Sequence, residues 1–300
     1  MEMPSMHRRF TSRAGLWGEI NGNGSLRRMQ QGEVTVNLFP GTELEGGPTN
    51  LYLRRFDRAS HDPVGWTPLL GPSAPAEVSF GEDGPIIHGC WCGIQFDLRL
   101  RLSAAHPAWF WHLRVVNTAA EVLQVDVLYA QDIGLEHNGA IRNTEYYVSQ
   151  YVAHSPLHDT PNGVAVCVRQ NLGMGGANPW AVIGSLGNAV SFATDALQLH
   201  GLATRAGAGP AALRQARLAG VRRQHEHAMV TIQEETFELA PGVGADRGFY
   251  GWPAGSPLRR SGGAPPGGAG AGARSSATRR RYHRQVAFRH RAPCPGRGPV

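Results

Sequence analysis

The chain has 300 residues, of which 41 % are hydrophobic and 17 % charged, so it is long enough to bury a sizeable core. It has no lysine, because all 29 basic residues are arginines, and this excludes a Walker-type phosphate loop and Schiff-base lysine chemistry. No apolar stretch reaches the ~18 residues of a membrane span, no secretory signal is visible, and 4 cysteines are too few for a disulfide scaffold. We therefore expect a cytoplasmic protein that does not contact the membrane.

The predicted elements, in chain order, are mostly strands. The clearest strand is 94–102, where Ile94, Phe96 and Leu98 begin an apolar series that alternates with polar residues. The next two segments repeat this period without an intervening helical pattern, which predicts an antiparallel meander and an all-β sandwich. The predicted strands are 34–39, 51–56, 86–92, 94–102, 109–115, 123–129, 145–152, 163–170, 180–186, 190–194 and 228–239. Only 210–226 is predicted to be helical.

The C-terminal stretch 253–300 differs from the preceding sequence. It contains ten arginines and no acidic residue, whereas residues 1–252 contain nineteen arginines and 23 acidic residues. It is rich in glycine and proline and has no hydrophobic period, so we predict a folded domain over 14–252 and a disordered tail over 253–300. One interpretation of the tail is an arm that binds nucleic acid. We favour the other, a shifted reading frame in GC-rich DNA.

One short motif is typical of metal ligands. His88, Cys90 and Cys92 lie at alternate positions, so in a strand all three would face one way. Zinc usually takes four ligands at wider spacing, and the pattern also fits a buried strand with small thiols. We expect no metal site and no organic cofactor.

Two other groups of residues suggest carbohydrate chemistry. The run from Tyr147 to His154 is rich in aromatic and amide side chains, which bind the apolar faces and the hydroxyls of sugars. Aromatic packing between sheets explains the same composition. Asp132 and Glu136 could form an acid–base pair of the kind that glycoside hydrolysis needs, although two unrelated surface acids are the simpler interpretation.

Several separated motifs, in order, resemble the N-terminal β-sandwich domain of glycoside hydrolase family 94, most closely in its 1,2-β-oligoglucan phosphorylases and cyclic β-1,2-glucan synthases. The resemblance covers about residues 14–252. Its motifs are Asn21-Gly22-Asn23-Gly24-Ser25, Asn37-Leu38-Phe39, Glu45-Gly46-Gly47-Pro48, Asn50-Leu51-Tyr52-Leu53-Arg54, Trp66-Thr67-Pro68, Tyr147 to His154, Arg169-Gln170-Asn171, Asn178-Pro179-Trp180 and Phe237-Glu238-Leu239.

The resemblance implies an antiparallel supersandwich like that of galactose mutarotases. In complete relatives it is followed by a helical barrel that carries the general-acid aspartate and binds inorganic phosphate, the co-substrate. This chain stops resembling the family at Trp252, before the barrel, so no catalytic residue is assigned in it. Contacts to a β-glucan, or to the missing barrel, are assigned to seven residues: Tyr147, Gln150, Tyr151, His154, Arg169, Gln170 and Trp180.

Three functions remain as hypotheses. The favoured one is the carbohydrate-binding N-terminal domain of a β-glucan phosphorylase, present here as a fragment without catalytic activity of its own, with a homodimer contact on one face. A second is a stand-alone carbohydrate-binding or mutarotase-like module, whose acid–base pair would be His154 with Glu136 or Glu145. A third, less favoured, is nucleic-acid binding through the arginine-rich tail.

Overall fold

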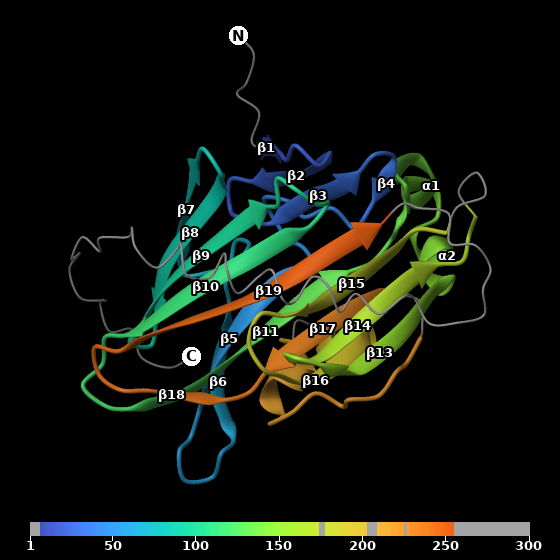
Figure 1. Cartoon of the computed structure of the whole chain (residues 1–300). Helices are drawn as coiled ribbons and strands as arrows, with labels where there is room; N and C mark the ends of the chain where they lie inside the picture. Colours follow the sequence, from blue (N-terminus) through green and yellow to red (C-terminus); the bar gives the residue numbers. More distant parts are fainter. Residues whose placement is uncertain (1–6, 174–177, 203–208, 225–226, 255–300) are drawn as a thin grey trace.

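The computed structural model describes residues 7–173, 178–202, 209–224 and 227–254. In these ranges the regular structure is almost entirely β, and it forms a curled 14-stranded sheet beside a five-stranded one (Figure 1). The predicted all-β class is confirmed. From residue 255 onward, the stretch predicted to be disordered lies outside the described residues.

The large sheet folds back on itself and forms two facing layers. The layers join where a single parallel residue pair, Gly163 with Ala189, connects β14 to β16. The first layer has eight strands, in the spatial order β7 (Ala76–Gly81), β8 (Gly84–Trp91), β9 (Ile94–Leu102), β10 (Trp109–Asn117), β19 (Gly244–Ala254), β15 (Trp180–Ser185), β14 (Gly163–Gln170) and β13 (Val152–Thr160). The second layer contains β6 (Pro63–Pro68), β5 (Asn50–Phe56), β11 (Leu123–Asp132), β17 (Ala228–Glu234) and β16 (Ala189–Asp195), with β18 (Phe237–Leu239) paired to β11.

The remaining elements cover the sandwich. The small sheet contains β1 (His7–Thr11), β2 (Leu16–Asn21), β3 (Leu26–Gln31), β4 (Val34–Thr35) and β12 (Glu136–His137). The helical segments are α1 (Asn138–Asn143), α2 (Glu145–Gln150), α3 (Ala196–His200) and a 3-10 turn, η2 (Ala211–Arg214). Among the described residues, none of the helices has the length and apolar character required to cross a membrane.

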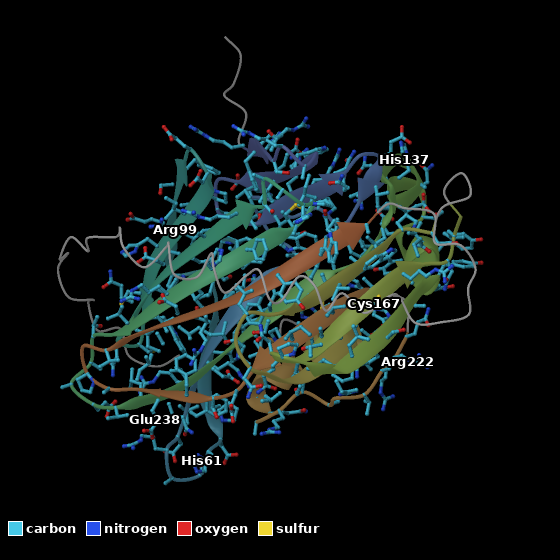
Figure 2. All side chains as sticks on the ribbon, viewed as in Figure 1. His61, Arg99, His137, Cys167, Arg222 and Glu238 are labelled. Atoms are coloured by element: carbon cyan, nitrogen blue, oxygen red, sulfur yellow. The ribbon has the colours of Figure 1, made fainter. Side chains whose placement is uncertain are left out.

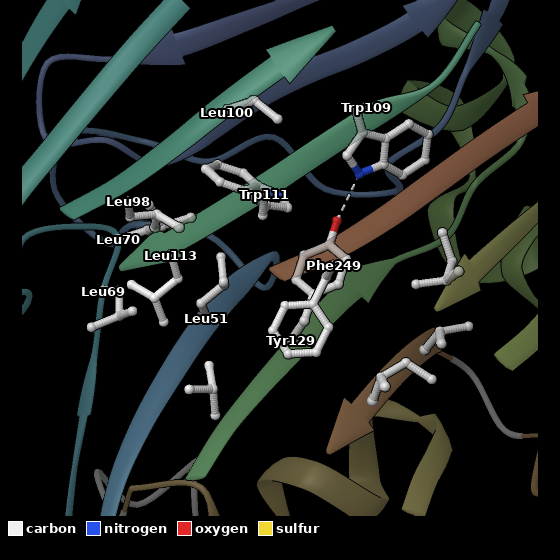
Figure 3. Packing of buried hydrophobic residues seen from close by; sticks show 14 of the residues in the cluster. Leu51, Leu69, Leu70, Leu98, Leu100, Trp109, Trp111, Leu113, Tyr129 and Phe249 are labelled. Carbon is white, nitrogen blue, oxygen red and sulfur yellow. Dashed lines mark hydrogen bonds between the residues drawn. The ribbon is translucent and has the colours of Figure 1, made fainter. Parts of the chain in front are cut away.

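The core lies between the two layers and follows from the alternating sequence pattern. Trp109 and Trp111 of β10 are fully buried, and the Nε1 of Trp109 donates a hydrogen bond of 3.0 Å to the hydroxyl of Tyr129 on β11 (Figure 3). The Tyr129 ring lies 5.4 Å from the ring of Phe249 on β19, so residues of both layers interlock. Gly251 allows this packing, because a Cβ at that position would lie 1.9 Å from the Trp109 ring.

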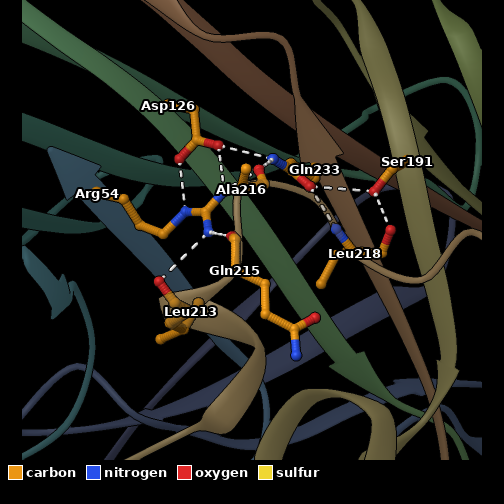
Figure 4. Close-up of polar contacts among 8 residues, drawn as sticks. All are labelled: Arg54, Asp126, Ser191, Leu213, Gln215, Ala216, Leu218 and Gln233. Atoms are coloured by element: carbon orange, nitrogen blue, oxygen red, sulfur yellow. Dashed lines mark hydrogen bonds and ion pairs between the residues drawn. The ribbon is translucent and has the colours of Figure 1, made fainter. Parts of the chain in front are cut away.

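The outer face of the second layer is also covered. A second apolar cluster lies there beneath α3 and η2 and includes Leu213 and Met229. Beside it, the buried guanidinium of Arg54 pairs with the buried carboxylate of Asp126, and Gln233 extends the network (Figure 4). Because both of its faces are buried, β11 is apolar along most of its length.

The structure corrects four of the predicted elements. Residues 145–152, predicted as a strand, form α2 and only the first residue of β13. The predicted helix 210–226 is limited to η2, and the described residues after it are not helical. The predicted strand 34–39 ends at Thr35, and 228–239 is divided into β17 and β18. The pattern analysis also missed β1, β2, β3, β6, β7, β12, β13 and β19.

Candidate functional site

Three of the predicted sugar contacts lie at the end of the sandwich where α2 leads into β13. The rings of Tyr147 and Tyr151 are 5.0 Å apart, and the Tyr151 hydroxyl donates to the Tyr147 hydroxyl over 3.2 Å. Both rings expose a large area, 52 % for Tyr147 and 37 % for Tyr151. Gln150 between them is exposed, and its backbone carbonyl accepts a hydrogen bond from Gln224. Exposed rings beside an amide are suited to binding a sugar.

Arg169 and Trp180 lie on the neighbouring strands β14 and β15. They are directly opposite each other in the strand register, so both side chains point to the outer face of the first layer. The Arg169 guanidinium donates to the Asn178 side chain over 3.1 Å. The backbone N–H of Asn171, directly after β14, donates to the carbonyl of Tyr151, directly after α2. The end of β14 therefore lies beside the end of α2. The structure therefore brings five of the predicted residues to one end of the domain.

The other two predicted contacts are buried, which corrects their assignment. The Gln170 amide nitrogen donates to the carbonyls of Gly134 and Val148, and its oxygen accepts from the N–H of Leu172. Gln170 thus fixes α2 to β14 and has no surface to offer a ligand. His154 is only 2 % exposed.

The environment of His154 does not support the acid–base pair proposed from the sequence. Neither of its ring nitrogens has a hydrogen-bond partner among the described residues, and so neither Glu136 nor Glu145 contacts them. Burial, together with the nearby Arg222 cation, lowers the pKa of His154 to about 4. Its imidazole is therefore neutral at physiological pH.

The two carboxylates proposed as a catalytic pair have structural partners. Asp132 accepts hydrogen bonds from the N–H groups of Leu38 and Phe39 and, over 2.5 Å, from the hydroxyl of Thr49. Burial raises its pKa to about 6, although these hydrogen bonds favour the ionised form. Glu136 is 7 % exposed and accepts from the N–H of His137. Asp132 therefore anchors the 36–49 loop to the second layer.

The His88, Cys90 and Cys92 motif does not lie on one strand face. Cys92 follows the end of β8 with a φ of 46°, so the strand geometry assumed for the motif ends before it. His88 contacts Asp97 on the adjacent strand, with 2.9 Å between Nδ1 and Oδ1. No group of three or more potential metal ligands was found in the ranges that the structure describes.

Comparison with known proteins identifies the domain. The profile of the SOGP N-terminal domain matches residues 19–251. The chain belongs to the SOGP N-terminal domain family. This confirms the resemblance noted from the sequence motifs. The domain is 28 % identical over 217 residues to a 1,2-beta-oligoglucan phosphorylase of Listeria innocua serovar 6a, and the match covers 72 % of this chain and 19 % of that protein.

A solved structure shares the fold of this SOGP N-terminal domain. A bacterial glucoamylase complexed with acarbose superposes with a TM-score of 0.52 at 6 % identity, over 83 % of this chain and 32 % of the glucoamylase. A putative aldose 1-epimerase of Escherichia coli K12 gives a TM-score of 0.44 at 10 % identity, over 83 % of this chain and 100 % of the epimerase. At such low identity the glucoamylase match shows the fold alone.

Proposed function

We propose that the chain is the carbohydrate-binding N-terminal domain of a β-glucan phosphorylase. The family match over residues 19–251 and the similarity to a protein named 1,2-beta-oligoglucan phosphorylase support this proposal. The chain spans about a fifth of that relative (19 %), so the activity of a complete protein is part of the proposal. In such a protein, inorganic phosphate attacks the anomeric carbon of a β-1,2-glucan and releases glucose 1-phosphate with inversion, while a general acid protonates the departing oxygen.

The domain's own contribution is proposed to be binding. Asp132 and Glu136 are buried and hydrogen-bonded to backbone groups, so neither is placed to protonate a sugar oxygen at the surface. We place the general acid and the phosphate site in the catalytic barrel of the complete protein, which would be this domain's partner.

The observation that carries the proposal is the exposed group around α2 and the adjoining strands. The Tyr147 and Tyr151 rings offer flat apolar surfaces, while the Gln150 amide and the Arg169 guanidinium offer donors for sugar hydroxyls. Trp180 adds a half-buried indole on the same strand pair as Arg169. Flat rings beside planar polar groups favour a sugar over a purely apolar ligand.

Calorimetry with β-1,2-glucooligosaccharides tests the proposal. The full chain should bind them, and Tyr147→Ala or Tyr151→Ala should weaken binding by about tenfold, since a stacking ring is lost. Tyr147→Phe and Tyr151→Phe keep the rings and serve as matched controls. In a parallel assay with phosphate, the chain should release no glucose 1-phosphate. Failure to bind any β-glucan would refute the proposal.

A further inference from the structure

The outer face of the first layer carries side chains that the proposed function has not used. Trp109 and Trp111 of β10 point into the core, so Phe110 and His112 between and beyond them point outward. Residues directly opposite each other on paired strands share a face. The strand registers therefore define an outward set of side chains that runs from β10 across β19 and β15 to β14.

Aromatic side chains form a row along this outward set. Phe110 is opposite Tyr250 of β19, and Tyr250 is opposite Gly184 of β15. Two residues farther along β19, Trp252 packs edge-to-face on Trp180, with ring centroids 6.0 Å apart. We call Phe110, Tyr250, Trp252 and Trp180 the aromatic row. All four are half-buried, and their strands β10, β19 and β15 lie side by side in Figure 1.

Gly184 allows the middle of the row to lie flat. A Cβ at Gly184 would be 2.6 Å from the hydroxyl oxygen of Tyr250 and 2.7 Å from its Cζ. The phenol ring therefore lies across the neighbouring strand, over a position that has no side chain. Burial raises the pKa of the Tyr250 hydroxyl, as expected for a ring held against the sheet. Across the three strands the row is about 10 Å wide, at ~4.8 Å per strand.

Charged residues of both signs border the row. His112 stacks on Phe110 with ring centroids 5.9 Å apart, and Arg114, two positions farther along β10, pairs with Asp246 over 3.1 Å. On the next strand, Arg99 lies in register with His112 (Figure 2 labels Arg99 on this face). Arg101, in register with Phe110, pairs with Asp83 over 3.4 Å, and Asp97 lies in register with Arg114. Because acidic side chains accompany the arginines, this face is suited to a neutral polyhydroxylated ligand rather than to a nucleic-acid backbone.

We infer that this face binds a β-glucan chain that extends from Trp180 across β19 to Phe110, with the sugar rings stacked on the aromatic row. The inference rests on the proposed function for the class of sugar. It shares Trp180 with the proposed site and extends that site along the sheet through Trp252 and Tyr250 to Phe110. The flat rings stack on apolar sugar faces, and the bordering arginine, aspartate and histidine side chains bind hydroxyls.

The test is calorimetric titration of the full chain with sophorose and with longer β-1,2-glucooligosaccharides. Trp252→Ala should weaken binding of the longer oligosaccharides by about tenfold and change sophorose binding less, because a disaccharide covers fewer rings of the row than a longer chain does. Gly184→Val should have the same effect without removing a ring, since it displaces Tyr250. Trp17→Ala removes another half-buried tryptophan, on β2 of the small sheet, and should leave binding unchanged.

The outcomes separate the two proposals. If Trp252→Ala and Gly184→Val bind long oligosaccharides like the unaltered chain, while Tyr151→Ala does not, the aromatic row is refuted and the proposed function stands. If the unaltered chain binds no β-glucan, both are refuted. Circular dichroism and the thermal midpoint identify any variant that does not fold. If Trp252→Ala does not fold, Gly184→Val decides the test, and Trp252→Phe, which keeps a ring in the row, should retain binding.

Discussion

Arg54→Met should destabilise the domain by several kcal/mol. The Arg54 side chain is fully buried, and its Nε and Nη2 donate to the Asp126 carboxylate over 2.8 and 2.5 Å. Its guanidinium also donates to three backbone carbonyls, that of Leu213 in η2 and those of Gln215 and Ala216 directly after η2. Removing one partner of a buried ion pair costs about 3–5 kcal/mol, and each carbonyl left without its donor adds about 1 kcal/mol. The loss is comparable to the ~5–15 kcal/mol net stability of a typical domain.

Urea unfolding of the full chain measures the effect. Arg55→Met is the matched control, because Arg55 is the next residue on β5 and its ion pair with Glu121 is exposed. The double substitution Arg54→Met with Asp126→Leu should be less destabilising than Arg54→Met alone, since no charge then remains buried without a partner. If Arg54→Met unfolds within about 1 kcal/mol of Arg55→Met, the network does not stabilise the domain as argued.

Three further predictions concern stability. Leu98→Asp should cost about 2–5 kcal/mol or prevent folding, because Leu98 is fully buried, whereas Arg99→Asp should change stability by about 0.5 kcal/mol; equal soluble yields and thermal midpoints would contradict this. Burial lowers the pKa of His154 from 6.5 to about 4, so the free energy of unfolding should fall as the pH drops from 6.5 towards 4. His154→Phe should lack that part of the pH dependence in urea titrations. Burial raises the pKa of Asp132 from 3.8 to about 6, so the unaltered chain should lose stability relative to Asp132→Asn as the pH rises from 3.8 to 6. A difference in unfolding free energy between the two chains that stays constant over this range would refute the assignment.

The strands that the sequence predicted most clearly, β9 and β10, have a strict period of two with one buried face. In 94–102 the apolar residues from Ile94 to Leu100 are fully buried and their polar neighbours are half-exposed. This information is local, so no knowledge of the partner strand is needed. In contrast, β19 contains Tyr250 and Trp252 on its outer face and glycines among them, which weakens the contrast between its faces. Its alternation around Phe249 could have indicated a strand, and with it the aromatic row.

Predictions failed where distant residues decide the local structure. The Tyr146-Tyr147-Val148 run favours a strand by composition, yet it forms the helix α2. The Gln170 side chain on β14 stabilises this helix by donating a hydrogen bond to the Val148 carbonyl. The alanine-rich 210–226 segment favours a helix, but Arg54 binds carbonyls that a helix would use internally. Gln170 and His154 appeared as surface contacts because their side chains are polar, and a sequence does not show that the fold buries them.

The position of β19 has a consequence for synthesis on the ribosome. It is the last strand of the residues that the structure describes, but it lies between β10 and β15, near the middle of the first layer. Until residues 244–254 leave the exit tunnel, the β7–β10 meander and the β13–β15 group each end in an unpaired edge strand. A nascent chain in that state offers two long strand edges for pairing with other polypeptides. We therefore expect the domain to close late, when this strand of eleven residues pairs with β10 on one side and β15 on the other.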